Sequence, residues 1–266
     1  MRVKLLDLLD DGIEAIDLAQ PLETGMPVSP THPGFQFALR QRHGDVERPD
    51  GMTGSHEMLV LGGHVGTHMD ALCHVAVDGR LHGGVAVADA LDDGRYRSHG
   101  IDQVPPLVRR GVLVDVPAVR GLDRLPPGEP VSVEDLRAAG VVPKRGDVVL
   151  VRTGWAQLWD DPPAYLGDER GVPGLDAGAA AWLADQGVAA VGADTIALEH
   201  IPPGGGLARL PVHRLLLAEH GINLIEVMAL EAIAARGVRE FLFVGAPLNV
   251  RGATGAPIRP LALVGS

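Results

Sequence analysis

Short apolar runs, separated by turns that contain glycine or proline, recur along the chain, and each holds about four to six apolar residues. Runs of this length with turn residues at both ends are typical of buried β-strands, because helices need longer periodic stretches. The pattern therefore predicts strands at 57–63, 111–116, 147–154, 187–194, 222–227 and 240–246.

Helical patterns lie between several of these runs in the second half of the chain. Ser132 precedes one of them with Asp135 three residues later, which is a capping-box arrangement, and Gly140 ends it. Further helices are expected from Asp176 to Gly187, from Pro211 to Gly221, and over 229–237. This alternation of strands and helices predicts an α/β fold.

The first half of the chain is less regular. Residues 20–34 and 105–111 are rich in turn formers, and residues 40–57 are polar and interrupted by glycines. None of these segments has the composition of a low-complexity linker. We therefore expect one domain over residues 1–266, with elaborated loops in its N-terminal half.

Composition and charge exclude several classes of function. A formal net charge of -11 with scattered basic residues argues against a nucleic-acid surface, and no apolar run approaches the ~20 residues that span a membrane. The first twenty residues carry acids within their apolar stretch, so no secretory signal is expected. Cys73 is the only cysteine, which excludes an internal disulfide and fits a reducing cytoplasm. A cytoplasmic protein that acts on a small molecule is expected.

The densest candidate chemistry is the run GGHVGTHMDALCH at residues 62–74. On a regular helix Asp70 would lie about 200° around the axis from His68, and the glycines discourage a helix. We expect a strand that enters a tight turn, with Gly66 allowing the imidazoles of His64 and His68 to meet the carboxylate of Asp70. Two imidazoles and a carboxylate are a usual ligand set for a divalent metal, with positions left for water.

Simpler interpretations of this run exist. A lone histidine is more often structural than a ligand, but four coordinating groups in eleven residues favour a metal site. Cys73 could act as a nucleophile only with exposure and an activating base, and a small buried cysteine is the commoner case. A protein that binds metal without catalysis also remains open, although it would give His74 no task.

The run HVGTHMDALCH resembles the H-x-G-T-H-x-D-x-x-x-H signature of the cyclase-like metal hydrolases, the family of bacterial kynurenine formamidase and isatin hydrolase. Five further segments resemble the family in the same order. They are its opening D-L-x-x-P-L segment (16–30), its R-T-G-W strand (149–159), its G-x-D-T segment (192–199), an H-x-x-L-L segment ending in glutamate (211–226) and a Gly-rich C-terminal strand (247–263).

The resemblance implies a fold and roles for individual residues. The fold would be the swivelling β/β/α type, with a mixed, barrel-like sheet and flanking helices. His64, His68 and Asp70 match the family's metal ligands for Mn²⁺ or Zn²⁺, and His74 matches its catalytic proton donor and acceptor. His213 and Glu226 match the residues that complete a second metal site or support the first. A homodimer or higher homo-oligomer is also implied.

The implied reaction is hydrolysis of a small cyclic amide of the isatin kind, or of a related amide. Metal-bound water would attack the carbonyl, and His74 would act as general acid and base. The formamidase branch usually has proline where this chain has Leu72, and the longer first half is closer to the isatin hydrolase branch.

Other reactions of the same site remain alternatives. They are an N-formylkynurenine-type formamidase, a lactone hydrolase, and a polyketide-type cyclase or dehydratase. The few aromatic side chains that could stack on a substrate are Phe35, Phe37, Trp155 and Trp159, and of these Phe35 and Trp155 are the candidates for substrate binding. Trp182 is expected in the core.

Overall fold

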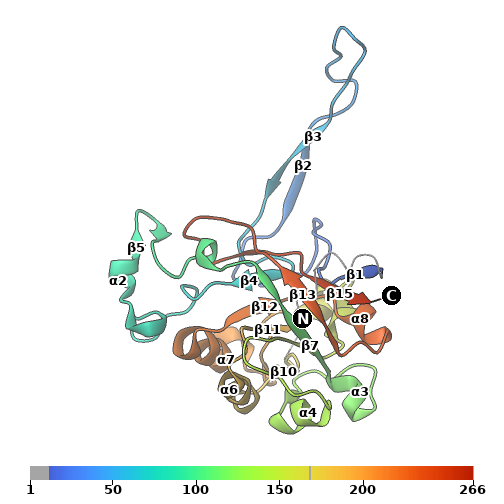
Figure 1. Cartoon of the computed structure of the whole chain (residues 1–266). Helices are drawn as coiled ribbons and strands as arrows, with labels where there is room; N and C mark the ends of the chain where they lie inside the picture. The colour runs from blue at the N-terminus through green and yellow to red at the C-terminus, as the bar shows by residue number, and fades with distance from the viewer. Residues whose placement is uncertain (1–11, 168, 266) are drawn as a thin grey trace, which may run out of the picture.

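A nine-stranded mixed sheet forms the centre of the protein, in a computed structural model that describes residues 12–167 and 169–265 (Figure 1). Residues 1–11, where no secretory signal is expected, lie outside the described residues. In order across the sheet, the strands are β1 (Ile13–Asp17), β15 (Leu261–Gly265), β13 (Glu240–Gly245), β7 (Leu107–Asp115), β9 (Val148–Arg152), β11 (Ala190–Ala193), β12 (Asn223–Glu226), β4 (His68–Asp70) and β14 (Gly255–Pro257).

Four parallel strands, β7, β9, β11 and β12, occupy the middle of this sheet, and antiparallel strands continue it on both sides. These four strands and β13 confirm the strands expected at 111–116, 147–154, 187–194, 222–227 and 240–246. Although residues 105–111 are rich in turn formers, β7 already begins at Leu107 and pairs there with β13.

Both faces of the sheet are covered, as its central strands require. Every residue of β9 is buried, with Val149 and Val151 packed into one apolar cluster and Val148 and Leu150 into another. Strands buried on both faces form continuous apolar runs rather than alternating ones, which explains the pattern in the sequence.

Helices cover the first face. Leu136, Leu183 and Leu216 from three helical segments share the cluster of Val149 and Val151, and Figure 1 shows these segments beneath the sheet. The helices are α2 (Val87–Ala90), α3 (Val116–Arg120), α4 (Val133–Ala138), α5 (Pro162–Leu166), α6 (Ala177–Gln186), α7 (Pro211–His213), α8 (Glu231–Ala235) and the π-helix η5 (Arg214–His220). The 3₁₀ turns are η1 (His82–Gly84), η2 (Ile101–Gln103), η3 (Trp155–Leu158) and η4 (Gly206–Ala208).

The four expected helices are present. The side chains of Ser132 and Asp135 cap α4 reciprocally, and Asp176 caps α6, which ends at Gly187. The helix expected from Pro211 to Gly221 is α7 continued by η5, and α8 occupies the middle of the range 229–237. Within the described residues, no helix has the length and apolar content that crossing a membrane requires.

The second face is closed because the sheet curls. Ile16 of β1 lies near one end of the strand order, and Met69 of β4 and Ala256 of β14 lie at the other, yet all three pack into one cluster with Leu150. A half-barrel therefore forms the core, with helices on its outside. The expected α/β fold with a barrel-like mixed sheet and flanking helices is confirmed.

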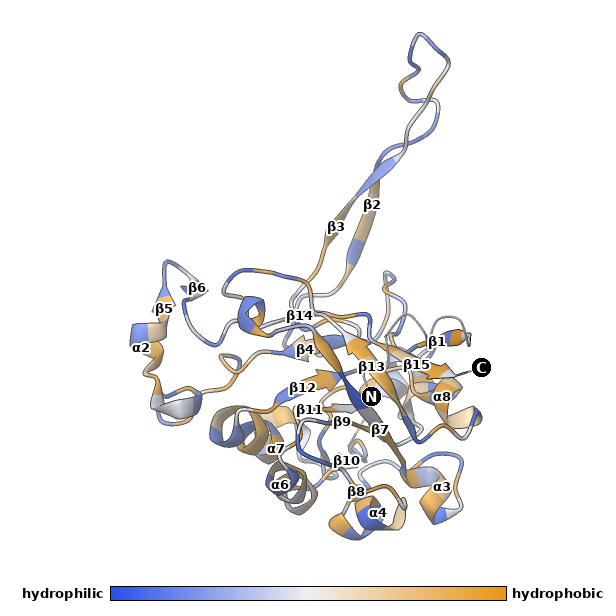
Figure 2. Cartoon of the chain, in the orientation of Figure 1, coloured by the Kyte–Doolittle hydropathy of each residue, from blue (hydrophilic) through white to orange (hydrophobic). Residues whose placement is uncertain are grey.

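Three further pairs of strands lie outside this sheet: β2 (Gln36–Gln41) with β3 (His56–Val60), β5 (Leu91–Asp92) with β6 (Arg95–Tyr96), and β8 (Pro130–Val131) with β10 (Gly174–Leu175). The β2–β3 hairpin projects far from the body (Figure 1). We call residues 36–60 the arm. The segment 57–63 was expected to be a buried strand, and this is wrong because every residue of β3 is exposed on the arm. Parts of both strands of the arm are coloured as hydrophobic in Figure 2.

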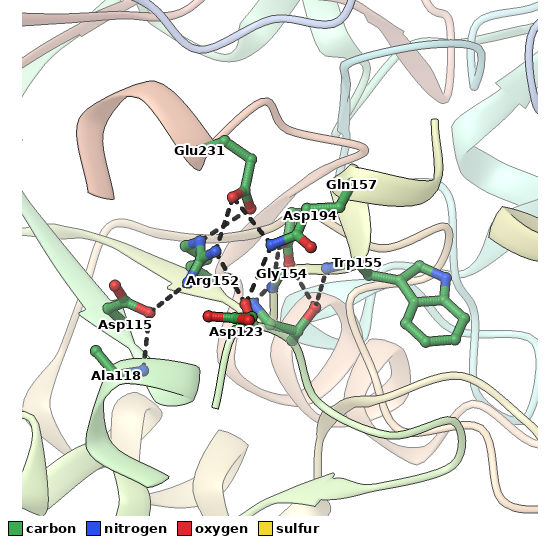
Figure 3. A network of polar contacts seen from close by, with 10 residues as sticks. Asp115, Ala118, Asp123, Arg152, Gly154, Trp155, Gln157, Asp194 and Glu231 are labelled. Atoms are coloured by element: carbon green, nitrogen blue, oxygen red, sulfur yellow. Dashed lines mark hydrogen bonds and ion pairs between the residues drawn. The ribbon is translucent and has the colours of Figure 1, made fainter. Parts of the chain in front are cut away.

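A polar network joins the carboxyl ends of the parallel strands (Figure 3). Arg152, the last residue of β9, donates from Nη1 to Oδ1 of Asp115 at the end of β7, over 2.8 Å. Its Nη2 donates to Oε2 of Glu231 in α8 over 2.7 Å. The arginine of the R-T-G-W segment thus ties two strands and a helix together.

Asp194, which follows β11, completes the scaffold (Figure 3). Its carboxylate accepts the backbone N–H groups of Thr153 and Gly154, each over 2.8 Å, and the Thr153 hydroxyl over 2.7 Å. Complete burial raises the pKa of Asp194 to about 6, although these donors favour the charged form. Two segments of the family resemblance therefore fix the loops that follow β9 and β11.

Candidate metal centre

Within residues 62–74 the bend at Gly66 is present as expected, but it leads into the short strand β4 rather than following a strand. Gly66 adopts a left-handed backbone conformation with φ +58°, and a Cβ atom there would lie 2.3 Å from Leu22. This left-handed conformation favours glycine, because a residue with a Cβ atom would be strained there. The bend brings His64 back towards Asp70 at the end of β4.

Asp70 receives both imidazoles of the run. Its Oδ1 lies 2.7 Å from Nδ1 of His64 and 3.5 Å from Nε2 of His68. The Nε2 of His64 lies 2.9 Å from the hydroxyl of Thr254, which precedes β14. The structure thus brings together the three ligands that the sequence predicted, and adds a threonine from the distant Gly-rich segment.

Sheet pairing adds Glu226 to this group. Glu226, the last residue of β12, lies directly opposite His68 of β4 in the antiparallel register. Its Oε2 lies 3.3 Å from Nε2 of His68, and its Oε1 lies 3.1 Å from Nε2 of His213. The two distant residues implied by the resemblance therefore lie beside the run, with His213 Nε2 3.7 Å from Oδ2 of Asp70.

Glu199, which sequence reasoning missed, orients His213. Its Oε1 lies 2.6 Å from Nδ1 of His213 and accepts the backbone N–H of the same residue over 3.0 Å. Its Oε2 accepts the N–H of Val212 over 3.1 Å. The available signal was an acid at the end of the largely apolar segment 192–199, because a carboxylate that becomes buried needs such partners.

His74 lies over the ligand group from the other end of the run. Its ring centroid is 4.1 Å from that of His64 and 6.2 Å from that of His213. Burial is the largest cause that lowers the pKa of His74 to about 4, and His64 and His213 lower it further. The ring of His74 is therefore neutral near pH 7, with no hydrogen bond to either nitrogen from the described part of the chain.

The buried charges of this group call for a cation. Asp70 and Glu226 are buried side by side, and Oδ2 of Asp70 and Oε1 of Glu226 have no hydrogen-bond partner among the described residues. Burial raises the pKa of each carboxyl, but the neighbouring imidazoles outweigh it and keep both values below normal. Two carboxylates buried this close to each other repel, and a bound cation would offset that cost, so the residues present fit a divalent metal.

Two overlapping sets of side chains could hold such an ion. One is His64, Asp70 and His74, and the other is His68, Asp70 and Glu226, with the ligand atoms of each set within 4.8 Å of one another. Asp70 belongs to both sets, so it is placed to bridge two ions. His74 thus lies where it could bind an ion or transfer a proton.

A cavity of about 210 Å³ opens above this group. His64, His68, His74, His213 and Glu226 line it, together with a wall of mostly apolar side chains. The size suits a small ring compound rather than a polymer.

The two aromatic candidates for substrate contact, Phe35 and Trp155, do not line this cavity. Both are buried in an apolar cluster, and Trp155 donates its indole N–H to the carbonyl of Tyr165 over 2.7 Å. Trp159 is buried with them, and Trp182 packs against the helix-covered core as expected. Phe37 lies exposed on the arm.

The interpretation of Cys73 as a structural residue fits its surroundings. The side chain is buried, and burial raises the pKa of its thiol to about 12. The reactive thiolate is therefore scarce at neutral pH.

Comparisons with known proteins agree with the geometry. The family described as "Putative cyclase" matches residues 16–200. An isatin hydrolase from Roseibium aggregatum is 26% identical over 269 residues, which cover 97% of this chain and 94% of that protein. A solved structure described as a novel cyclase has a TM-score of 0.85 at 26% identity, covering 98% of this chain and 93% of the other. Isatin hydrolase A from Ralstonia solanacearum has a TM-score of 0.75 at 25% identity, covering 98% and 97%.

The family match spans more than half of the chain and includes the whole run from His64 to His74. The fold of the solved relatives extends over nearly all of it. On these grounds the chain belongs to the cyclase family.

Proposed function

We propose that this protein is a metal-dependent hydrolase, one domain over residues 1–266, that opens the C–N bond of a small cyclic amide of the isatin kind. One observation carries the proposal. Within the described residues no hydrogen bond engages the neutral imidazole of His74, which lines a small cavity beside two buried carboxylates and three further histidines. The full-length similarity to an isatin hydrolase supports a cyclic amide as the substrate class.

His64, His68 and Asp70 would hold the metal, which we propose to be Mn²⁺ or Zn²⁺. His213 and Glu226 would hold a second ion or support the first, and Glu199 fixes the ring of His213 for either task. When bound, the ion lowers the pKa of water and polarises a carbonyl oxygen.

His74 would carry the protons of the reaction. Its neutral ring accepts the proton of the attacking water, and the resulting imidazolium then donates this proton to the departing amide nitrogen. Without such a donor the tetrahedral intermediate would return to substrate, and a positioned acid–base group contributes about 10²–10⁴-fold. Mostly apolar side chains line the cavity around this exchange.

We also propose that the protein is a cytoplasmic homodimer or higher homo-oligomer. The arm supports this, because Phe37, Leu39, Met58 and Leu59 are each between 43% and 51% exposed on it. An isolated two-stranded hairpin is marginally stable, and contiguous exposed apolar surface marks interaction sites. A second copy of the chain is the partner that we propose for the arm.

The test begins with elemental analysis of the purified protein. The metal-loaded protein is then incubated separately with isatin, N-formylkynurenine and a small lactone, and products are identified by mass spectrometry. We expect isatin to gain the mass of one water with a dependence on metal. Turnover of N-formylkynurenine or the lactone alone would assign the site to another hydrolase, and a product with no added water would assign it to a cyclase.

A further inference from the structure

The walls of the metal cavity offer few polar side chains besides the candidate ligands and His74. These are Ser29, Thr31 and His32, all from the loop that precedes the arm. The hydroxyl groups of Ser29 and Thr31 lie 3.0 Å apart and bond each other. His32 is therefore the one side chain of this loop whose polar atoms are not already used within the described residues.

His32 is held in a defined place. Its backbone N–H donates to the carbonyl of Ser29 over 3.0 Å, and Pro30 and Pro33 restrict the loop on both sides. Its ring stacks on that of His64, with centroids 5.1 Å apart and planes at 20°. The ring centroid of His74 lies 6.5 Å away. Sequence reasoning missed His32, because it stands outside the run of residues 62–74.

A cyclic amide bound here would meet a mostly apolar wall except at this point. The scissile carbonyl of a bound substrate would lie beside Asp70 and His64. The ring of His32 stacks on the ring of His64. An oxygen adjacent to the scissile carbonyl is thus the substrate atom within reach of His32. Such an oxygen would lose its hydrogen bonds to water on entering the cavity, and needs a donor there.

We propose that His32 binds the substrate by donating a ring N–H to an oxygen on the carbon next to the scissile carbonyl. The inference rests on the proposed hydrolase function and names its substrate class more closely. The preferred substrates are lactams that carry an oxo group beside the amide carbonyl, and their ring-opened products are α-keto acids. Lactams without that group gain nothing from His32.

The test compares His32→Phe with His32→Asn. Phenylalanine keeps a flat ring over His64 but has no donor, whereas asparagine keeps a short N–H donor. For isatin we expect His32→Phe to raise KM at least tenfold with a smaller change in kcat, the size of effect given by one hydrogen bond. His32→Asn should recover part of the loss. Metal content should match that of the wild type in both variants.

A matched substrate separates the hydrogen bond from a general disturbance. 2-Oxindole has the same ring system without the second carbonyl, and can be measured as substrate or as competitive inhibitor. Its KM or inhibition constant should be the same for the wild type and His32→Phe. An unchanged KM for isatin in His32→Phe, or an equal loss for 2-oxindole, overturns the assignment. So does loss of metal in His32→Phe, which would show that the ring only supports His64.

Binding of the ring-opened product tests His32 independently of hydrolysis. If the wild type does not hydrolyse isatin, calorimetry measures binding of 2-aminophenylglyoxylate, the ring-opened α-keto acid, to the metal-loaded protein. Binding that weakens at least tenfold in His32→Phe upholds the role of His32 in holding the vicinal oxygen. Binding that is equal in both proteins, or absent from the wild type, rejects it.

Discussion

Nδ1 of His64 lies 2.7 Å from Oδ1 of Asp70, six positions further along the chain. The turn at Gly66 makes this approach possible, and both side chains are almost completely buried. The other oxygen of the same carboxylate has no hydrogen-bond partner in the described part of the chain. That oxygen is therefore available to bind a cation.

Removing a ligand should remove metal and activity together. We expect His64→Ala, His68→Ala and Asp70→Ala each to lose bound metal, because each takes one donor from the primary set. Elemental analysis after purification measures this, with His220→Ala as a control, since His220 is an exposed histidine outside the group. Stoichiometric metal in the Asp70 variant would contradict the assignment.

Replacing His74 should separate proton transfer from metal binding. His74→Asn is expected to keep its metal and lower kcat by roughly 10²-fold or more, the range for loss of a general acid–base. KM should change little, because the lost interaction belongs to the transition state. If the variant loses metal as fully as His64→Ala, then His74 is a ligand in the set with His64 and Asp70.

The dependence of activity on pH should change with metal concentration. With limiting metal, activity should fall below about pH 6, because protons compete with metal for the imidazoles of the ligands. The pKa of His74 is lowered to about 4, so its ring remains a base well below its normal range. Saturating metal should therefore move the acid limb of the rate profile to lower pH. An acid limb that stays at the same pH at every metal concentration argues against this arrangement.

Asp194 should make stability depend on pH independently of the metal. Its folded-state pKa is raised to about 6 from a normal value of 3.8, so the folded protein holds a proton that the unfolded chain releases. The stability that Asp194 contributes is then fully present below about pH 4 and is lost as pH rises through about 6. The loss is at most ~3 kcal/mol.

The comparison that isolates this effect is between the wild type and Asp194→Asn, which does not titrate. Chemical denaturation gives the free energy of unfolding of both proteins from pH 4 to 7. The difference, wild type minus variant, should shrink as pH rises. A difference that grows with pH would mean that the hydrogen bonds from Thr153 and Gly154 outweigh burial and lower the pKa.

Polar residues on the arm should dissociate the proposed dimer. Phe37 and Leu59 pair across the two strands and are about half exposed, so they offer adjoining apolar surface to a second copy. The double variant Phe37→Ser, Leu59→Ser should change the mass measured by light scattering from oligomer to monomer. Val142→Ser is the control, because Val142 is an exposed apolar residue off the arm. A monomeric wild type would reject the proposal.

Local sequence patterns determined much of the fold. The central strands could be predicted from the sequence because burial on both faces makes them continuous apolar runs, as in β9. The start of α4 could be predicted because the side chains of Ser132 and Asp135 cap the backbone N–H groups there, and both residues lie within the same short segment. The meeting of His64 with Asp70 was also local, since it needs only the turn at Gly66.

Tertiary structure decided the features that depend on distant partners. An apolar strand has the same sequence pattern whether it enters a core or projects from it, so the exposure of β3 on the arm was not predictable from the pattern alone. Phe35 and Trp155 are apolar enough for a substrate pocket or for a core, and packing placed them in the core.

The site itself shows the same division. The run from His64 to His74 predicted a metal site from its residue types and their spacing. Strand pairing brought Glu226 opposite His68, and the loop before the arm brought His32 onto His64. These contacts join residues far apart in the chain, and only the folded sheet and its loops bring them within reach of one cavity.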